Sequence, residues 1–342
     1  MTVGLAGSGP AAAAVEAALD DVDEPVERVA VEGIATHRLA VVVDRAGAAT
    51  FERASDIARE SETPWFAVEV GGVGGYPVVD AAVAAFDPAG TCYRCLSARV
   101  ESNVPEDADP SAAPADATIR FAGAVAGRRA ASVVAGDADP FGTVVELPHA
   151  ERDLLPVPGC GCGGDRSRAL DRDHVDREVG DALARAERGL DERVGLVQEV
   201  GEAESYPAPY YLAGICDTGA FSDATAARQA AGVDPGWDAA FMKALGEGYE
   251  RYCAGVYRES SFHTAAAVDL DGAVSPSSFV RPDSWIGDEG PDGAERPWVP
   301  GQDLATGAPV SLPAEAVHYP PPERTIRPSV TTGLGLGNST VE

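Results

Sequence analysis

Residues 2–19, TVGLAGSGPAAAAVEAAL, open with a short apolar run, pass through a glycine turn and continue into an alanine-rich stretch. This order predicts a strand over Thr2–Leu5, a turn at Gly7-Ser8-Gly9-Pro10 and a helix over Ala13–Leu19. Such a turn lets the backbone approach a phosphate or pack tightly, and the helix N-terminus offers free N–H groups to an anion. A single glycine motif leaves both nucleotide binding and a purely structural turn open.

Further strands are expected outward from this turn, at 28–31, 39–43 and 65–70, with a helix at 48–60. The alternation of strands and helices predicts a parallel sheet, so the first domain is expected to be α/β and Rossmann-like. This domain is expected to end near residue 165, because the segment that follows is rich in glycine and charge, as linkers are.

The composition is strongly acidic, with 55 acidic against 26 basic residues, a net charge of −29 and one lysine, Lys243. Such a surface stays hydrated in concentrated salt, where charge repulsion is screened, and this indicates the cytoplasm of a halophile. It argues against a broad nucleic-acid surface, which needs clustered Lys and Arg. The sequence has neither a membrane-spanning apolar stretch nor a signal peptide, so we expect no membrane association and a cytoplasmic location.

Four of the six cysteines form two close pairs, Cys92 with Cys95 and Cys160 with Cys162, on either side of a predicted helix at 119–134. Two thiol pairs from distant loops can supply the four tetrahedral ligands of a structural Zn²⁺. The alternative is that these cysteines are reduced and bind no metal. The remaining cysteines, Cys216 and Cys253, are expected to be small buried apolar residues.

A helix is predicted over Trp237–Val256, with an apolar stripe that faces the core. Glu247, Glu250 and Arg251 fall together on another face, at positions i, i+3 and i+4. Paired carboxylates are hard oxygen ligands that hold Mg²⁺ while substrate phosphates complete its coordination shell. The alternative is an exposed Glu–Arg helix face with no ligand.

The sequence around this helix, KALGEGYERYC over Lys243–Cys253, resembles the YcaO family. The segments Trp298–Gly307 and Val310–Tyr319 resemble the family's connection to the second half of its site. Residues 331–342, TTGLGLGNSTVE, are similar to its glycine-rich turn, with Asn338 and Glu342 at the nucleotide-binding Asn and Glu.

The resemblance implies an ATP·Mg²⁺ site made of Glu247, Glu250, Arg251, Asn338 and Glu342, with the three glutamates as Mg²⁺ ligands. It also implies ATP-dependent activation of a backbone amide in a peptide or protein substrate, giving an azoline by cyclodehydration or a thioamide. No side chain of the chain is needed as a covalent nucleophile, so no catalytic residue is assigned.

Residues 1–165 resemble the ThiF-like domain of bacteriocin-type cyclodehydratases, through the glycine turn and the two cysteine pairs. This domain contains no lysine, and the second pair is Cys-x-Cys where the family usually has Cys-x-x-Cys. We therefore expect a non-adenylating docking domain with a four-cysteine zinc site. Substrate recognition or sulfur supply would then call for a separate leader-binding or sulfur-delivery protein.

The expected organisation is the ThiF-like domain over 1–165, a linker with a leading helix and strand over 166–200, and the N-terminal part of an α+β YcaO domain over 201–342. The printed sequence ends where the family's helix would supply further carboxylates, so weak ATP binding is expected of these residues alone. The alternative function is an inactive or split-partner zinc scaffold that docks in a peptide-modifying complex. A homodimer is left open.

Overall fold

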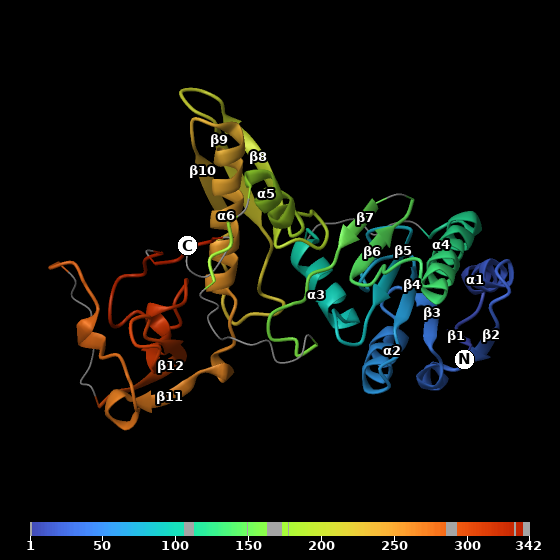
Figure 1. Ribbon diagram of the computed structural model, residues 1–342, viewed down its shortest axis with the longest axis horizontal. Coiled ribbons are helices and arrows are strands. Elements are labelled where there is room, and N and C mark those ends of the chain that lie inside the picture. The colour runs from blue at the N-terminus through green and yellow to red at the C-terminus, as the bar shows by residue number, and fades with distance from the viewer. Residues whose placement is uncertain are drawn as a thin grey trace. The chain divides into compact units, whose positions relative to one another are not determined.

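A computed structural model describes residues 2–105, 113–148, 150–162, 173–176, 178–284, 293–331 and 333–337. Contacts divide the chain into two compact units, coloured by sequence order in Figure 1. The first comprises Met1–Ala169 with Arg188–Gln198, and the second comprises Leu170–Glu187 with Glu199–Glu342. In the described ranges, no helix has both the length and the apolar character needed to cross a membrane.

The first unit is built on a seven-stranded sheet with the order β2-β1-β3-β4-β5-β6-β7. Neighbouring strands from β2 to β4 are parallel, and those from β4 to β7 are antiparallel. The strands are β1 Val3–Ala6, β2 Val26–Val29, β3 Leu39–Arg45, β4 Trp65–Val70, β5 Ala81–Phe86, β6 Thr143–Glu146 and β7 Ala150–Asp153. The four strands predicted from the sequence, β1 to β4, are parallel to one another as expected, whereas the antiparallel strands β5 to β7 were not predicted. Strand β5 was missed because its run AAVAAF is mostly alanine, a residue that is depleted in strands.

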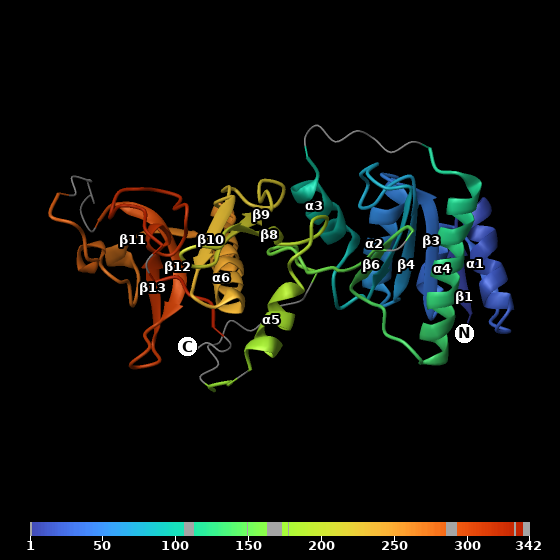
Figure 2. The ribbon, with the colours of Figure 1, turned by 90° about the horizontal axis from the view of Figure 1, so that it is seen from above.

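Helices cover both faces of this sheet. They are α1 Pro10–Asp20, α2 Ala49–Glu60, α3 Tyr93–Asn103 and α4 Asp116–Ala135, with a 3₁₀ turn at Val31–Thr36. One buried apolar cluster joins α1 and α4 to the sheet, and a second joins α2 and α3 to its opposite face. Figure 2 shows α1 and α4 side by side. Because both faces are covered, β3 is apolar and buried from Leu39 to Val43.

Glycines set how closely these elements pack. A β-carbon on Gly123 of α4 would lie 2.1 Å from the carbonyl oxygen of Ala11 in α1. In the turn after β1, Gly7 has φ +114°, and a β-carbon there would lie 2.2 Å from the carbonyl oxygen of Val43. Packing against β3 therefore explains Gly7 without any ligand.

The second unit contains two three-stranded sheets. In the first, with the order β10-β9-β8, the strands are β8 Val197–Glu204, β9 Tyr210–Ile215 and β10 Gln229–Val233. The second has the order β11-β12-β13, with β11 His263–Ala266, β12 Glu295–Gln302 and β13 Pro309–Pro313. The helices of this unit are α5 Val179–Glu187 and α6 Trp237–Gly255. Helix α6 packs on β9 and β10, and it agrees with the predicted helix to within one residue.

Residues 188–198, which the sequence places in the linker, pack on the first unit. Arg152 of β7, with a side chain only 10% exposed, forms ion pairs with Asp191 and with Glu146 of β6. Arg193 pairs with the same Glu146. These buried pairs fix the segment to the edge of the sheet.

Candidate functional site

Helix α6 is held close to strand β10. A β-carbon on Gly232 of β10 would lie 2.2 Å from the carbonyl oxygen of Ala240, so only glycine allows this approach. On α6, Leu245 and Tyr252 are buried, as the apolar stripe predicts. Glu247, Glu250 and Arg251 are all half-buried.

Both carboxylate oxygens of Glu247 are engaged. Strand β10 is at the edge of its sheet, and the backbone N–H of Ala231 donates to Oε2 of Glu247 at 2.9 Å. Oε1 of Glu247 accepts a hydrogen bond from Nη2 of Arg251 at 2.6 Å. Burial by itself raises the pKa of Glu247, but the Ala231 amide and the Arg251 guanidinium outweigh it and hold the pKa below the usual 4.5.

Glu250 differs from Glu247 in having no hydrogen bond or ion pair within the described part of the chain. A half-buried carboxylate with no partner among the described residues is able to accept a hard cation such as Mg²⁺. Lys243, in contrast, is engaged outside this group, because Nζ donates to Oδ2 of Asp234 at 2.8 Å. The helix therefore offers one engaged and one unengaged carboxylate beside a guanidinium.

The glycine-rich turn lies against the middle of α6. A β-carbon on Gly246 would lie 3.4 Å from Cδ2 of Leu336, an ordinary van der Waals distance. Gly246 directly precedes Glu247, so two motifs that are far apart in the sequence meet at this point. Asn338 and Glu342 lie outside the described residues.

The segment between these motifs is anchored as well. Strands β12 and β13 form a hairpin whose turn is closed by Asp303, and the buried Trp298 donates from Nε1 to the carbonyl oxygen of Ala265 at 2.9 Å. After the hairpin, the carboxylate of Glu315 accepts hydrogen bonds from the backbone N–H groups of 325–327 and from the Thr325 hydroxyl. These contacts fix the path of the chain toward the glycine-rich turn.

The four predicted metal-ligand cysteines come together in the first unit. The Sγ atoms of Cys92, Cys95, Cys160 and Cys162 all lie within 4.8 Å of one another. The closest pairs are Cys95 with Cys162 at 3.2 Å, Cys92 with Cys160 at 3.5 Å and Cys92 with Cys95 at 3.8 Å. Sulfurs on one tetrahedral Zn²⁺ are about 3.8 Å apart, from Zn–S bonds of about 2.3 Å. The cluster could therefore hold a metal ion.

Surrounding contacts build this cluster. Helix α3 begins directly after Cys92, and the N–H of Val157 donates to Sγ of Cys95 at 3.3 Å. The buried guanidinium of Arg99 donates to the carbonyl oxygens of Leu155 and Pro156, just before the second cysteine pair. Hydrogen bonding with the Cys160 thiol lowers the pKa of Cys92 to about 6, which favours a thiolate there.

Of the two other cysteines, Cys216 is buried as expected, whereas Cys253 is exposed. The expectation for Cys253 is therefore wrong. Cys253 lies one turn after the half-buried Tyr249, at the margin of the apolar stripe, where its side chain reaches solvent.

The family match found by comparison with known proteins lies within the second unit. Residues 232–342 match the YcaO cyclodehydratase family. The description of that family includes binding of ATP and Mg²⁺. The YcaO match begins in β10 and contains α6, the β12–β13 hairpin and the glycine-rich turn. No curated protein matches the chain.

Among solved structures, a heterocyclase in complex with substrate and cofactor is similar to 96% of this chain, with a TM-score of 0.65 and 18% sequence identity. At this level of identity the likeness concerns the fold alone. The chain spans 52% of the length of that heterocyclase. YcaO from Methanopyrus kandleri, bound with AMPPCP and Mg²⁺, has 23% identity, a TM-score of 0.34 and coverage of 48% of this chain and 40% of its own. Escherichia coli MccB with MccA-N7isoASN has 12% identity and a TM-score of 0.35. The match covers 48% of this chain and 67% of MccB.

One buried carboxylate outside the YcaO match was not predicted. Glu69, 1% exposed at the end of β4, accepts hydrogen bonds from the N–H groups of Gly74 and Gly75 and from the Tyr93 hydroxyl. Burial raises the pKa of Glu69 above its usual value, although the three hydrogen-bond donors act to lower it. A single acidic residue in the apolar run WFAVEV, followed directly by GGVGG, is the signal that could have found it.

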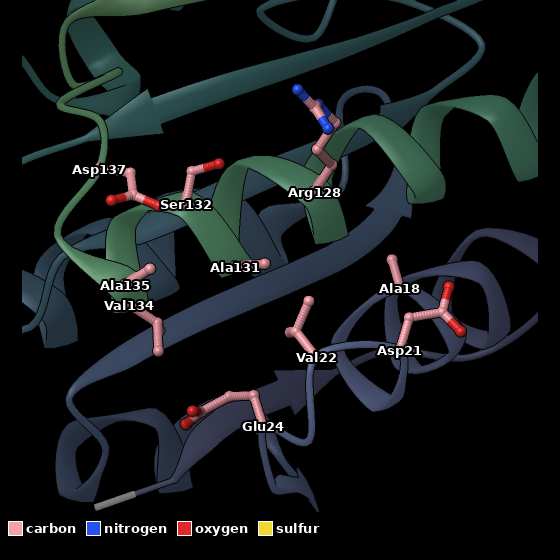
Figure 3. A pocket seen from close by; sticks show the side chains of 10 residues that line it. All are labelled: Ala18, Asp21, Val22, Glu24, Arg128, Ala131, Ser132, Val134, Ala135 and Asp137. Atoms are coloured by element: carbon pink, nitrogen blue, oxygen red, sulfur yellow. The ribbon is translucent and has the colours of Figure 1, made fainter.

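A groove of about 540 Å³ lies between α1 and α4 of the first unit (Figure 3). Small apolar side chains such as Ala18 and Ala131 line it, with Asp21, Arg128 and Asp137 at its sides. No residue of the cysteine cluster and none of the YcaO match lines this groove. We assign it no role.

Proposed function

We propose that the protein uses ATP and Mg²⁺ to activate a backbone amide of a peptide or protein substrate, for azoline or thioamide formation. The YcaO match over 232–342 supports ATP-dependent amide activation in general. The paired carboxylates and the guanidinium on α6 supply the side-chain chemistry that such a site requires.

The observation that carries this proposal is the contact between Leu336 and Gly246. It brings the turn that precedes Asn338 beside the helix that bears Glu247 and Glu250. Carboxylates from these two sources would then converge on one Mg²⁺ ion.

The residues of the site have distinct roles in this proposal. Glu250, unengaged within the described chain, is proposed as a direct Mg²⁺ ligand, and Glu247 and Glu342 as the others. Arg251 and Asn338 are proposed to position phosphate groups. When bound, ATP supplies the phosphoryl group that converts the amide oxygen into a leaving phosphate. The side chains of this site bind and orient, and none of them is proposed as a nucleophile.

In the first unit, we propose that Cys92, Cys95, Cys160 and Cys162 hold a structural Zn²⁺. The Sγ distances of 3.2 to 3.8 Å between the closest pairs support four ligands on one tetrahedral ion. We further propose that this unit is a ThiF-like docking domain rather than an adenylating one, in a protein adapted to high salt. A separate leader-binding or sulfur-delivery protein is the partner that this role implies.

The proposal is tested by incubating the protein with ATP, Mg²⁺ and candidate peptides, with and without sulfide, and measuring product masses. Loss of water would indicate azoline formation, and exchange of oxygen for sulfur would indicate a thioamide. Neither change, together with no ATP turnover, would contradict amide activation and favour a zinc-stabilised scaffold.

A further inference from the structure

The guanidinium of Arg251 is contacted from two directions. Glu247, one turn earlier on α6, accepts its Nη2 hydrogen bond at 2.6 Å. Cζ of Arg251 also lies 5.1 Å from the centre of the Tyr319 ring, within the range of a cation–π contact. The Arg251 side chain is only 18% exposed, so water competes little with either contact.

Tyr319 is itself held in place by the last turn of α6. Its backbone N–H donates to the carbonyl oxygen of Ala254 at 3.1 Å. A β-carbon on Gly255 would lie 3.1 Å from the carbonyl oxygen of Tyr319, so glycine permits the close approach of this segment. The hydroxyl of Tyr257 donates to the carbonyl oxygen of Pro320 at 3.0 Å. The backbone of Tyr319 is therefore fixed to the end of the helix that carries Arg251.

We propose that Tyr319 is a positioning residue, whose ring holds the Arg251 guanidinium in place for the phosphates of a bound nucleotide. The inference rests on the proposed function of the α6 site. It adds a residue whose side chain acts through Arg251 and contributes no metal ligand.

The physical reason lies in the flexibility of arginine. A guanidinium on a long side chain loses rotamer freedom whenever it binds a ligand, and a group that is already held loses less. A single hydrogen bond to Glu247 leaves the guanidinium free to turn about that bond. An aromatic face against the guanidinium restricts this rotation, and any aromatic ring of similar size has the same effect.

Three variants separate the ring from the hydroxyl. Tyr319→Phe keeps the ring and is expected to bind Mg·ATP as the wild type does. Tyr319→Trp is also expected to retain binding, whereas Tyr319→Leu fills similar space without an aromatic face and is expected to weaken Mg·ATP binding roughly fivefold. In turnover assays, the Leu variant should raise KM for ATP and leave KM for the peptide unchanged. Unfolding midpoints of all three variants show whether the fold is retained.

A double-mutant cycle with Arg251→Gln provides the decisive comparison. If Tyr319 acts through Arg251, Tyr319→Leu has no further effect on Mg·ATP affinity in the Arg251→Gln background. Equal losses in both backgrounds, unchanged binding by Tyr319→Leu, or an equal loss in Tyr319→Phe would each overturn the inference and leave the proposed function standing. A wild-type protein that binds no Mg·ATP would overturn the proposed function and this inference together.

Discussion

Leu336 lies beside Gly246, the residue that directly precedes Glu247 on α6, and a β-carbon on Gly246 would lie 3.4 Å from Cδ2 of Leu336. Gly246→Ala is therefore expected to be tolerated. Gly246→Val adds methyl groups that meet Leu336 and displace the glycine-rich turn. This variant is expected to lower Mg·ATP affinity at least about tenfold, because displacement of positioning groups by about 1 Å is costly.

The Ala and Val variants are compared by calorimetry and by circular dichroism. The Ala variant controls for the change in helix propensity, since both replace glycine in the same helix. Equal Mg·ATP affinities in Gly246→Val and the wild type would show that the turn does not contribute to the site.

Glu247→Gln tests the engaged carboxylate. The variant keeps a similar shape but loses the charge that pairs with Arg251, and we expect a stability loss of about 0.5–1.5 kcal/mol at neutral pH. Because the folded-state pKa of Glu247 lies below 4.5, the wild-type advantage is complete above that pH. It is lost as the pH falls through the lower folded-state value.

Urea unfolding of both proteins at neutral pH and at about pH 3 measures this difference. The comparison with the variant cancels the general acid sensitivity of a chain with net charge −29. A wild-type advantage that stays constant between the two pH values would contradict the role of the Glu247 charge.

The cysteine cluster predicts about one Zn²⁺ per chain, since four thiolates make one tetrahedral site. Cys92→Ser and Cys160→Ser are expected to lose the metal and to lower the unfolding temperature, as should treatment with a chelator. Cys253→Ser is the matched control, because Cys253 is exposed and lies outside the cluster. Purified protein without metal that unfolds at the same temperature as the Cys92→Ser variant would refute the zinc assignment.

The buried Glu69 predicts an order of stability losses. Glu69→Gln turns an N–H₂ group toward a backbone N–H of the 71–75 loop, and an unsatisfied buried donor costs about 1–3 kcal/mol. Tyr93→Phe removes one of the three donors to Glu69 and is expected to lower the free energy of unfolding by about 1 kcal/mol. Glu60→Gln, at an exposed position, is the control and should change little. A loss for Tyr93→Phe larger than that for Glu69→Gln would argue against this geometry.

The sequence predicted those elements whose pattern is local. Helix α6 has a clear helical periodicity, and strand β4 is an apolar run rich in aromatic and β-branched residues; both agree with the structure. Strand β7, AERD, was not predicted because three of its four residues are charged, and strand β6, TVVE, has only two apolar residues.

In the candidate site, too, the sequence predicted local features but not contacts between distant segments. Spacing along one helix placed Glu247, Glu250 and Arg251 together. The contact of Leu336 with Gly246 and that of Tyr319 with Arg251 depend on how distant segments fold back, and no local pattern encodes this. Nor does spacing distinguish the engaged Glu247 from the unengaged Glu250, because the difference arises from the edge position of Ala231 in β10.

The most direct test of the account is the Mg²⁺-dependent binding of ATP, measured by calorimetry on the wild type and on Glu250→Gln, with Glu204→Gln at an exposed position of β8 as the control. We predict binding that requires Mg²⁺ in the wild type and the control, and an affinity at least about tenfold lower in Glu250→Gln, because a direct metal ligand is lost. Equal affinities in all three proteins, or no binding by any of them, would contradict the assignment of the α6 site.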